Sequence, residues 1–259
     1  LLLDDQRAIV EAHRAFFTAG AEIATTASYQ ATFDGFAAQG IDRGQTAELM
    51  TLSVRLARQA ASEVTDRPTW VAASMGPYGA MLADGSEYHG RYGLTVGELR
   101  QFHRPRLEVL AAAGADVLAF ETIPCAAEVE AVLTEIDGLG IDCWVSVSIE
   151  GSRTRAGEPV ADVAAMVKDV DEVVAFGVNC STPSDATDAV PTAARSDKPV
   201  IVYPNSGEGW DAVQRTWVAT TSEPSFPVHR WVAEGARMVG GCCRVTPHDI
   251  SAMAVQLAQ

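Results

Sequence analysis

Two adjacent cysteines near the end of the chain are the residues whose type and spacing first suggest chemistry. Cys242 and Cys243 stand in the stretch MVGGCCRVTPHDI, after two glycines and before a Thr-Pro helix start. A free cysteine often behaves as a buried apolar residue. Two neighbouring cysteines can also form a strained disulfide or bind one metal ion. The pair alone leaves all three interpretations open.

A third cysteine, Cys180, ends another apolar run, VVAFGVNC. Several thiolates suit zinc, and three protein ligands leave a fourth position open, as catalytic zinc sites do. Adjacent strand residues point to opposite faces, so Cys242 and Cys243 reach one ion only if the backbone turns there. Gly240 and Gly241 permit such a turn. Because no C-x-x-C pair is present, spacing alone does not establish a metal site.

The elements that position these cysteines are short apolar runs that alternate with longer segments of helical periodicity. This alternation predicts a parallel sheet covered by helices. The predicted strands are 23–28, 70–76, 117–122, 143–149, 173–180, 200–206 and 236–243. The chain opens on a predicted helix at 4–20, and further helices are predicted at 46–64, 95–114 and 246–258.

Several residues mark the ends of the predicted helices. Thr246 and Pro247 are suited to the N-cap and first positions of the last helix. Gly114 is suited to end the helix at 95–114, and Pro105 within it is expected to kink or split that helix.

Seven strands are enough for a doubly wound sheet, whereas a closed (β/α)8 TIM barrel needs eight. The barrel interpretation therefore expects a first strand that lies before Leu1. No repeat, linker or low-complexity tract divides the chain, so residues 1–259 are predicted to form a single domain.

Polar side chains collect where the predicted strands end. These residues include Tyr29, Tyr78 in the GPYG stretch, Glu121, Asn179 and Asn205. In parallel α/β folds the carboxyl ends of the strands build the active site. The sequence therefore nominates one edge of the sheet as the functional face.

Composition limits the possible partners and compartment. The chain is 47% hydrophobic and 20% charged, which is typical of a globular protein, and its net charge is −15. This acidic balance argues against nucleic acid and anionic membranes as partners. No apolar run reaches the length of a membrane span, and no signal peptide opens the chain. The five cysteines are an odd, scattered set that predicts a reducing cytoplasm, with Cys125 and Cys143 as structural residues.

The two cysteine motifs, GVNC at 177–180 and GGCC at 240–243, resemble the zinc signature of the homocysteine S-methyltransferase family. TTASYQATFDGF, SMGPYGAMLADGSEYHGRYG and FETIP also resemble that family, so the similarity spans essentially the whole chain. The long second stretch points to the branch that uses S-methylmethionine or S-adenosylmethionine. The resemblance implies a (β/α)8 barrel that is a zinc-dependent enzyme. Family members open with a strand carrying an Asp-Gly-Gly/Ala motif, which is not found here.

By this resemblance Cys180, Cys242 and Cys243 are the Zn²⁺ ligands and the catalytic residues. Homocysteine sulfur would take the fourth position and attack the methyl group of a sulfonium donor, giving methionine. Glu121 is the candidate for binding the homocysteine ammonium. The alternative role for Glu121 is a structural ion pair with an arginine at the end of the barrel.

Three further residues are candidates for the substrate site. Asn179 is expected to orient the substrate, and Tyr29 and Tyr78 to pack around it, unless the two tyrosines serve only packing. Two other functions remain open: the homocysteine module of a corrinoid-linked methyltransferase, and a non-catalytic zinc-binding barrel. The oligomeric state is not predicted.

Overall fold

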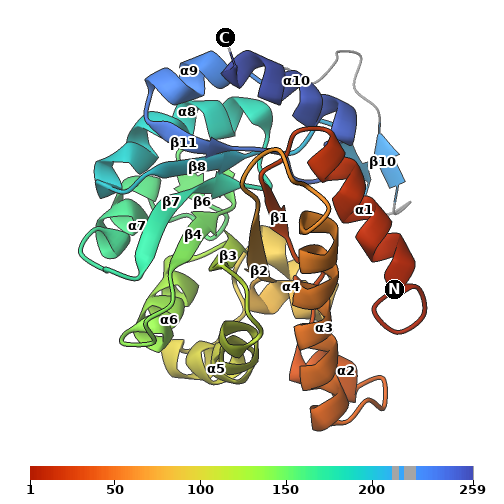
Figure 1. Ribbon diagram of the computed structural model, residues 1–259. Coiled ribbons are helices and arrows are strands. Elements are labelled where there is room, and N and C mark those ends of the chain that lie inside the picture. The colour runs from red at the N-terminus through yellow and green to blue at the C-terminus, as the bar shows by residue number, and fades with distance from the viewer. Residues whose placement is uncertain (212–215, 219–225, 259) are drawn as a thin grey trace.

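A computed structural model describes residues 1–211, 216–218 and 226–258 of the chain. Seven parallel strands form its central sheet, in the spatial order β1-β2-β3-β4-β7-β8-β11. Figure 1 shows that this sheet is curled and that the long helices lie on its outer side. The strands are β1 (Ile23–Thr25), β2 (Trp70–Met75), β3 (Val117–Ile123), β4 (Cys143–Val147), β7 (Val173–Asn179), β8 (Val200–Tyr203) and β11 (Ala236–Val239).

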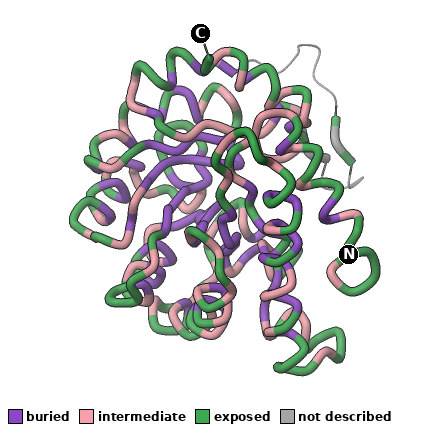
Figure 2. The backbone as a smooth tube through the Cα atoms, viewed as in Figure 1, coloured by how far each residue is buried: buried purple, intermediate pink, exposed green. Residues whose placement is uncertain are grey.

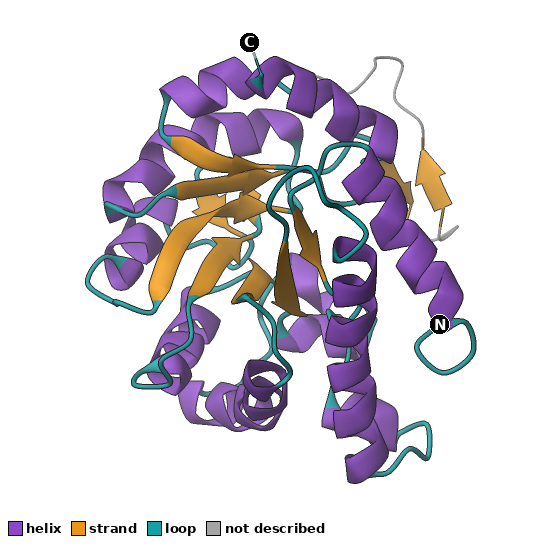
Figure 3. Ribbon diagram, viewed as in Figure 1, coloured by secondary structure: helices purple, strands orange, loops and turns teal. Residues whose placement is uncertain are grey.

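Helices connect the strands of the sheet, and two short hairpins lie outside it (Figure 3). The helices are α1 (Gln6–Thr18), α2 (Phe33–Ala37), α3 (Arg43–Ala61), α4 (Tyr78–Leu82), α5 (Val96–Ala112), α6 (Ala126–Ile136), α7 (Val160–Val167), α8 (Pro183–Ala193), α9 (Val228–Ala233) and α10 (Pro247–Leu257). Two turns of 3-10 helix are η1 (Ser86–Tyr88) and η2 (Ala194–Ser196). The hairpins pair β5 (Ile149–Glu150) with β6 (Arg153–Thr154), and β9 (Gly209–Asp211) with β10 (Thr216–Val218).

All seven predicted strands are present, and each begins at the predicted residue. Most end earlier than predicted, because the polar and glycine residues at their carboxyl ends leave the sheet and form loops. β8 ends at Tyr203 and β11 at Val239, three and four residues before the predicted ends at 206 and 243. In the described part of the chain the sheet is open between β11 and β1. An eighth strand that closes it therefore stays a prediction.

Helix α5 confirms the expected caps and excludes one of the two effects expected of Pro105. Thr95 caps its first turn in a capping box with Glu98, and Gly114 follows its end with φ of 84°. The helix runs on through Pro105 and is not split there. Proline removes the hydrogen bond to the carbonyl four residues earlier, and here that residue, Gln101, lies on the exposed side of the helix. Water can solvate this carbonyl, so the helix continues.

The two faces of the sheet carry different residues. Alternate positions such as Val71, Leu118 and Val145 pack outward against the helices in the larger apolar cluster. The concave face carries a smaller cluster that includes Trp144 and Tyr203. Figure 2 shows the strands as the most continuously buried part of the molecule. Side chains alternate between the two faces of a strand, so polar residues two or four positions away from these concave-face residues also lie on the concave face.

Gly177 in β7 illustrates how closely two strands approach. A Cβ atom at this position would lie 1.7 Å from the carbonyl oxygen of Ile201 in β8. We expect Gly177→Ala to lower the free energy of unfolding by about 3 kcal/mol, measured by urea denaturation, because backbone atoms must move apart. Gly97→Ala in α5 is the matched control, since its Cβ atom meets only Thr95 Oγ1 at 3.9 Å. An equal loss in both variants would contradict this explanation.

Candidate metal centre

The structure brings the three predicted cysteine ligands together. Cys180 directly follows β7, and Cys242 and Cys243 lie in the loop after β11. Their three sulfur atoms all lie within 4.8 Å of one another, and the Cys180 and Cys243 sulfurs are 3.8 Å apart. Two sulfurs bound at about 2.3 Å to one tetrahedral ion would be about 3.8 Å apart. The cluster therefore fits a metal ion.

The backbone around the cysteines is held by neighbouring loops. The amide of Cys242 donates to the carbonyl of Pro204 at 2.8 Å, and that of Cys243 donates to the Asn205 side chain at 3.1 Å. Cys180 has φ of 49° and Arg244 has φ of 66°, so the left-handed turns fall at these two residues. The turn that lets both cysteines face one point is thus made beside the pair.

The glycines before the pair act differently from the expectation. Neither Gly240 nor Gly241 has a positive φ. A Cβ atom at Gly241 would instead lie 2.1 Å from a methyl carbon of Val245. Gly241 is therefore needed because it leaves room for Val245, which follows the cysteine loop.

The three thiols of the cluster interact strongly with one another. All five cysteines are free, which excludes a Cys242–Cys243 disulfide in this structure. Hydrogen bonds from Cys180 and Cys242 lower the pKa of Cys243 to about 3. Hydrogen bonding with Cys180 and Cys243, together with burial, raises the pKa of Cys242 well above its usual range. A cation at the centre of the cluster would stabilise all three sulfur atoms as thiolates.

Glu121 lies on the concave face of β3 and is almost fully buried. Ser74 Oγ donates to one of its carboxyl oxygens, and Tyr203 OH donates to the other at 3.0 Å. Tyr203 OH in turn contacts Trp144 Nε1 at 3.1 Å and Ser146 Oγ at 2.6 Å. Burial raises the pKa of Glu121. Both side chains that bond its carboxyl group carry hydroxyls. No described arginine forms an ion pair with Glu121, so that alternative is wrong for the described part of the chain.

Asn179 joins the ends of β7 and β3. Its Oδ1 accepts a hydrogen bond from the Thr122 amide at 2.8 Å, and its Nδ2 donates to Thr122 Oγ1 at 2.8 Å. Nδ2 also lies 4.0 Å from Cys242 Sγ. Asn179 therefore positions the backbone between Glu121 and Cys180 and also reaches the cysteine cluster.

Replacing Asn179 with alanine should destabilise the protein. It leaves the buried amide of Thr122 without a partner, and such a loss costs about 1–3 kcal/mol. We expect the free energy of unfolding in urea to fall by that amount. Thr46→Ala is a matched control, because its buried hydroxyl bonds only a carbonyl of its own helix, that of Asp42. A loss for Asn179→Ala no larger than that for the control would contradict the role of Asn179.

The two predicted tyrosines have different surroundings. The half-buried Tyr29 is close enough to the cluster for a thiolate at Cys180 to raise its pKa, although burial is the larger cause. The ring of Tyr78 packs against Tyr92 and Phe102, with centroids 5.2 and 5.1 Å away. Its described contacts therefore lie outside the cysteine cluster. Tyr88, which the sequence did not single out, has its hydroxyl 3.9 Å from Cys180 Sγ.

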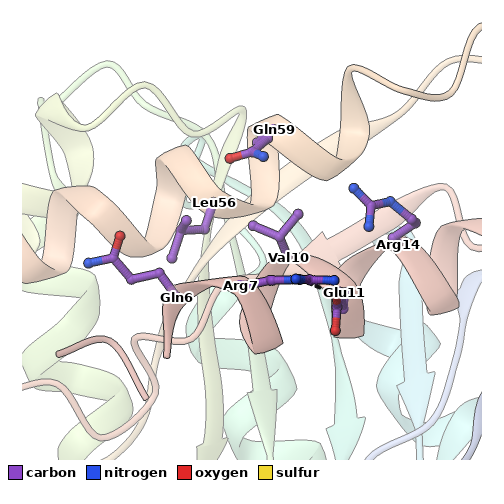
Figure 4. Close-up of a pocket in the computed structure, with 7 residues that line it drawn as sticks. All are labelled: Gln6, Arg7, Val10, Glu11, Arg14, Leu56 and Gln59. Carbon is purple, nitrogen blue, oxygen red and sulfur yellow. Dashed lines mark hydrogen bonds and ion pairs between the residues drawn. The ribbon is translucent and has the colours of Figure 1, made fainter. Parts of the chain in front are cut away.

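A separate pocket lies between helices α1 and α3 (Figure 4). Its lining is mainly polar, and none of the residues around the cysteines contributes to it. The ion pair between Arg7 and Glu11 occupies part of its wall. The pocket is therefore distinct from the candidate metal centre.

The cysteine cluster occurs in a chain that matches a known family over nearly its whole length. The family model described as Homocysteine S-methyltransferase matches residues 1–257. The chain belongs to the homocysteine S-methyltransferase family. In the described residues no helix is long and apolar enough to cross a membrane.

Members of this family from several organisms are similar to the chain. Homocysteine S-methyltransferase YbgG of Bacillus subtilis is 40% identical over 267 residues, covering 98% of this chain and 85% of the relative. Homocysteine S-methyltransferase of Escherichia coli is 42% identical over 264 residues, with the same two coverages, 98% and 85%. The metallated form of the homocysteine methyltransferase MmuM from Escherichia coli superimposes with a TM-score of 0.87 at 40% identity, covering 98% of this chain and 86% of that one.

Proposed function

We propose that this protein transfers a methyl group to the sulfur of homocysteine and so forms methionine. The observation that carries the proposal is the convergence of three thiols, from two distant segments, in a member of this family. The thiols lie at the carboxyl edge of a parallel sheet, where such folds build their active sites.

We propose Zn²⁺ as the metal and Cys180, Cys242 and Cys243 as its ligands. Thiolates select soft ions, and three protein ligands leave one position for a substrate. When bound, zinc would lower the pKa of the homocysteine thiol so that its sulfur is a thiolate at neutral pH. The metal character of the site is also favoured by the existence of a metallated MmuM structure.

The methyl donor is proposed to be a sulfonium, with S-methylmethionine ahead of S-adenosylmethionine. A lone pair of the homocysteine sulfur forms the new bond to the methyl carbon. The bond between that carbon and the sulfonium sulfur breaks, and its electron pair stays on the donor, which becomes a neutral thioether. No general acid is required, because the leaving sulfur needs no proton. The protein contributes by aligning the two sulfur atoms.

The protein side chains around the cluster would position homocysteine. Glu121 is the proposed partner of the ammonium group, because its carboxyl lies on the concave face and already has two hydroxyl donors that hold it in place. Substrate charge would favour the ionised form that burial opposes. Asn179 would hold the backbone beside Cys180, and Tyr29 would pack against the bound substrate.

The proposed function is tested by measuring methionine formation from homocysteine with one donor at a time. We expect product with S-methylmethionine and none with methylcobalamin or 5-methyltetrahydrofolate. Product formed only with methylcobalamin would favour the homocysteine module of a corrinoid-linked enzyme. Zinc binding without turnover of any donor would favour a non-catalytic barrel.

We also propose the domain organisation, the barrel architecture and the compartment of the protein. Residues 1–259 would act as one homocysteine-binding domain, since the family match extends over nearly all of them. The curled sheet would form most of a (β/α)8 barrel, because α1 contacts α10 and so brings the two ends of the ring of helices together. Five free thiols favour a reducing compartment such as the cytoplasm.

A further inference from the structure

The turn η1 holds Tyr88 against the cysteine cluster and carries Glu87 next to it in the chain. Tyr88 OH lies 3.9 Å from Cys180 Sγ. Burial raises the pKa of Glu87, and the negative charges of Asp84 and of a thiolate at Cys243 add to this effect. The turn is packed tightly, because a Cβ atom at Gly79 would lie 2.4 Å from the Glu87 amide nitrogen. The backbone of η1, which carries Glu87 and Tyr88, is therefore fixed by its packing against α4.

Glu87 has an unused hydrogen-bonding atom. Its Oε2 is buried and has no hydrogen-bond partner among the residues that the structure describes. A buried carboxylate oxygen without a partner is costly, so such a group is suited to a cationic ligand. The lysines and arginines of the described chain form no ion pair with Glu87.

Arg155 approaches the same tyrosine from the loop after β6. Its guanidinium carbon lies 5.9 Å from the centroid of the Tyr88 ring. Its Nε is buried and, within the described ranges, has no hydrogen-bond partner. Tyr88 therefore has the carboxylate of Glu87 next to it in the chain and the guanidinium of Arg155 near its ring. Each of these charged groups has one buried atom without a described hydrogen-bond partner.

The reaction requires places for two amino acids. Glu121 is the proposed partner of the homocysteine ammonium, and its carboxyl is already held by Ser74 and Tyr203. Glu87 is a second carboxylate, on a different element, and it directly precedes Tyr88, whose hydroxyl reaches Cys180. The second carboxylate and the guanidinium have the charges needed for an ammonium and a carboxylate group, respectively.

We propose that Glu87 and Arg155 bind the α-amino-acid end of the sulfonium donor, with Tyr88 packed against its carbon chain. Glu87 takes the α-ammonium and Arg155 the α-carboxylate, which directs the sulfonium methyl group toward the cysteine cluster. This assignment rests on the proposed function, and it makes an amino-acid sulfonium the preferred donor class.

The test compares three sulfonium compounds by calorimetric titration of the zinc-loaded protein. S-methylmethionine has both charged groups, 4-(dimethylsulfonio)butanoate lacks the ammonium, and (3-aminopropyl)dimethylsulfonium lacks the carboxylate. Glu87→Gln should raise the dissociation constants of the two ammonium compounds about tenfold or more and leave that of 4-(dimethylsulfonio)butanoate unchanged. Arg155→Gln should do so for the two carboxylate compounds and leave (3-aminopropyl)dimethylsulfonium unchanged.

Matched controls come from the adjacent hairpin. Glu150→Gln and Arg153→Gln change exposed residues of β5 and β6 and should leave all three constants unchanged. Equal effects of Glu87→Gln on all three compounds, or no effect, would overturn the proposal. Because binding is measured without turnover, this outcome is distinct from a failure to form methionine, which would contradict the proposed function instead.

Discussion

Replacing Cys242 or Cys243 with alanine should lower methyl transfer by about a thousandfold or more and remove the bound zinc. The variant keeps two sulfur ligands, which cannot hold the ion in a tetrahedral site with one open position. Loss of an outer-shell partner of a zinc ligand already costs about 10–100-fold, and loss of a ligand costs more. Zinc content by mass spectrometry and the rate of methionine formation check the prediction together.

Cys125→Ala provides the control for the cysteine variants. Cys125 is buried at the start of α6, and burial raises the pKa of its thiol to about 12, so it stays a neutral packing residue. This variant should keep one zinc per chain and its activity within about threefold of the unchanged protein, because only a small volume is lost. Full activity of Cys242→Ala, or zinc loss in Cys125→Ala, would contradict the assignment.

Replacing Glu121 with glutamine should raise KM for homocysteine by about a hundredfold. The amide has nearly the same shape, but it carries no charge for the substrate ammonium, and a hydrogen bond to a charged group is worth about 1.5–3 kcal/mol. In the unchanged protein the hydroxyls of Ser74 and Tyr203 both donate to the carboxyl oxygens of Glu121. In the variant, one of these hydroxyls must instead accept a hydrogen bond from the glutamine NH2 group. Steady-state kinetics at saturating donor give KM and kcat separately.

An acceptor thiol without an amino group shows whether Glu121→Gln acts by losing the contact with the substrate ammonium or by disturbing the structure of the site. With 4-mercaptobutyrate as acceptor, Glu121→Gln and the unchanged protein should have the same KM, since no ammonium is present. Equal weakening of both acceptors would show that Glu121 acts through the structure of the site rather than through the ammonium.

The strand pattern and the cysteine cluster were predictable because both follow from local sequence. Each apolar run begins where its strand begins, since burial on both faces of a parallel sheet demands continuous apolar residues. Three cysteines at strand ends were expected to meet because parallel strands share one carboxyl edge. The same logic placed Glu121 and Asn179 on that edge.

Other features depend on long-range packing that no local pattern reveals. Tyr78 follows a strand as Tyr29 does, but α4 directs its ring toward Tyr92 and Phe102. Tyr88 reaches Cys180 across a sequence separation of 92 residues, and only its place in the LADGSEY stretch offered a signal. The need for glycine at 241 comes from Val245.

X-ray absorption at the zinc edge measures directly how many sulfur atoms surround the metal. The zinc-loaded protein should have three sulfur neighbours at about 2.3 Å, and addition of homocysteine should raise this number to four. The Cys125→Ala protein should behave in the same way. A sulfur count that does not change when homocysteine binds would contradict the claim that the three cysteines leave one metal position for the substrate.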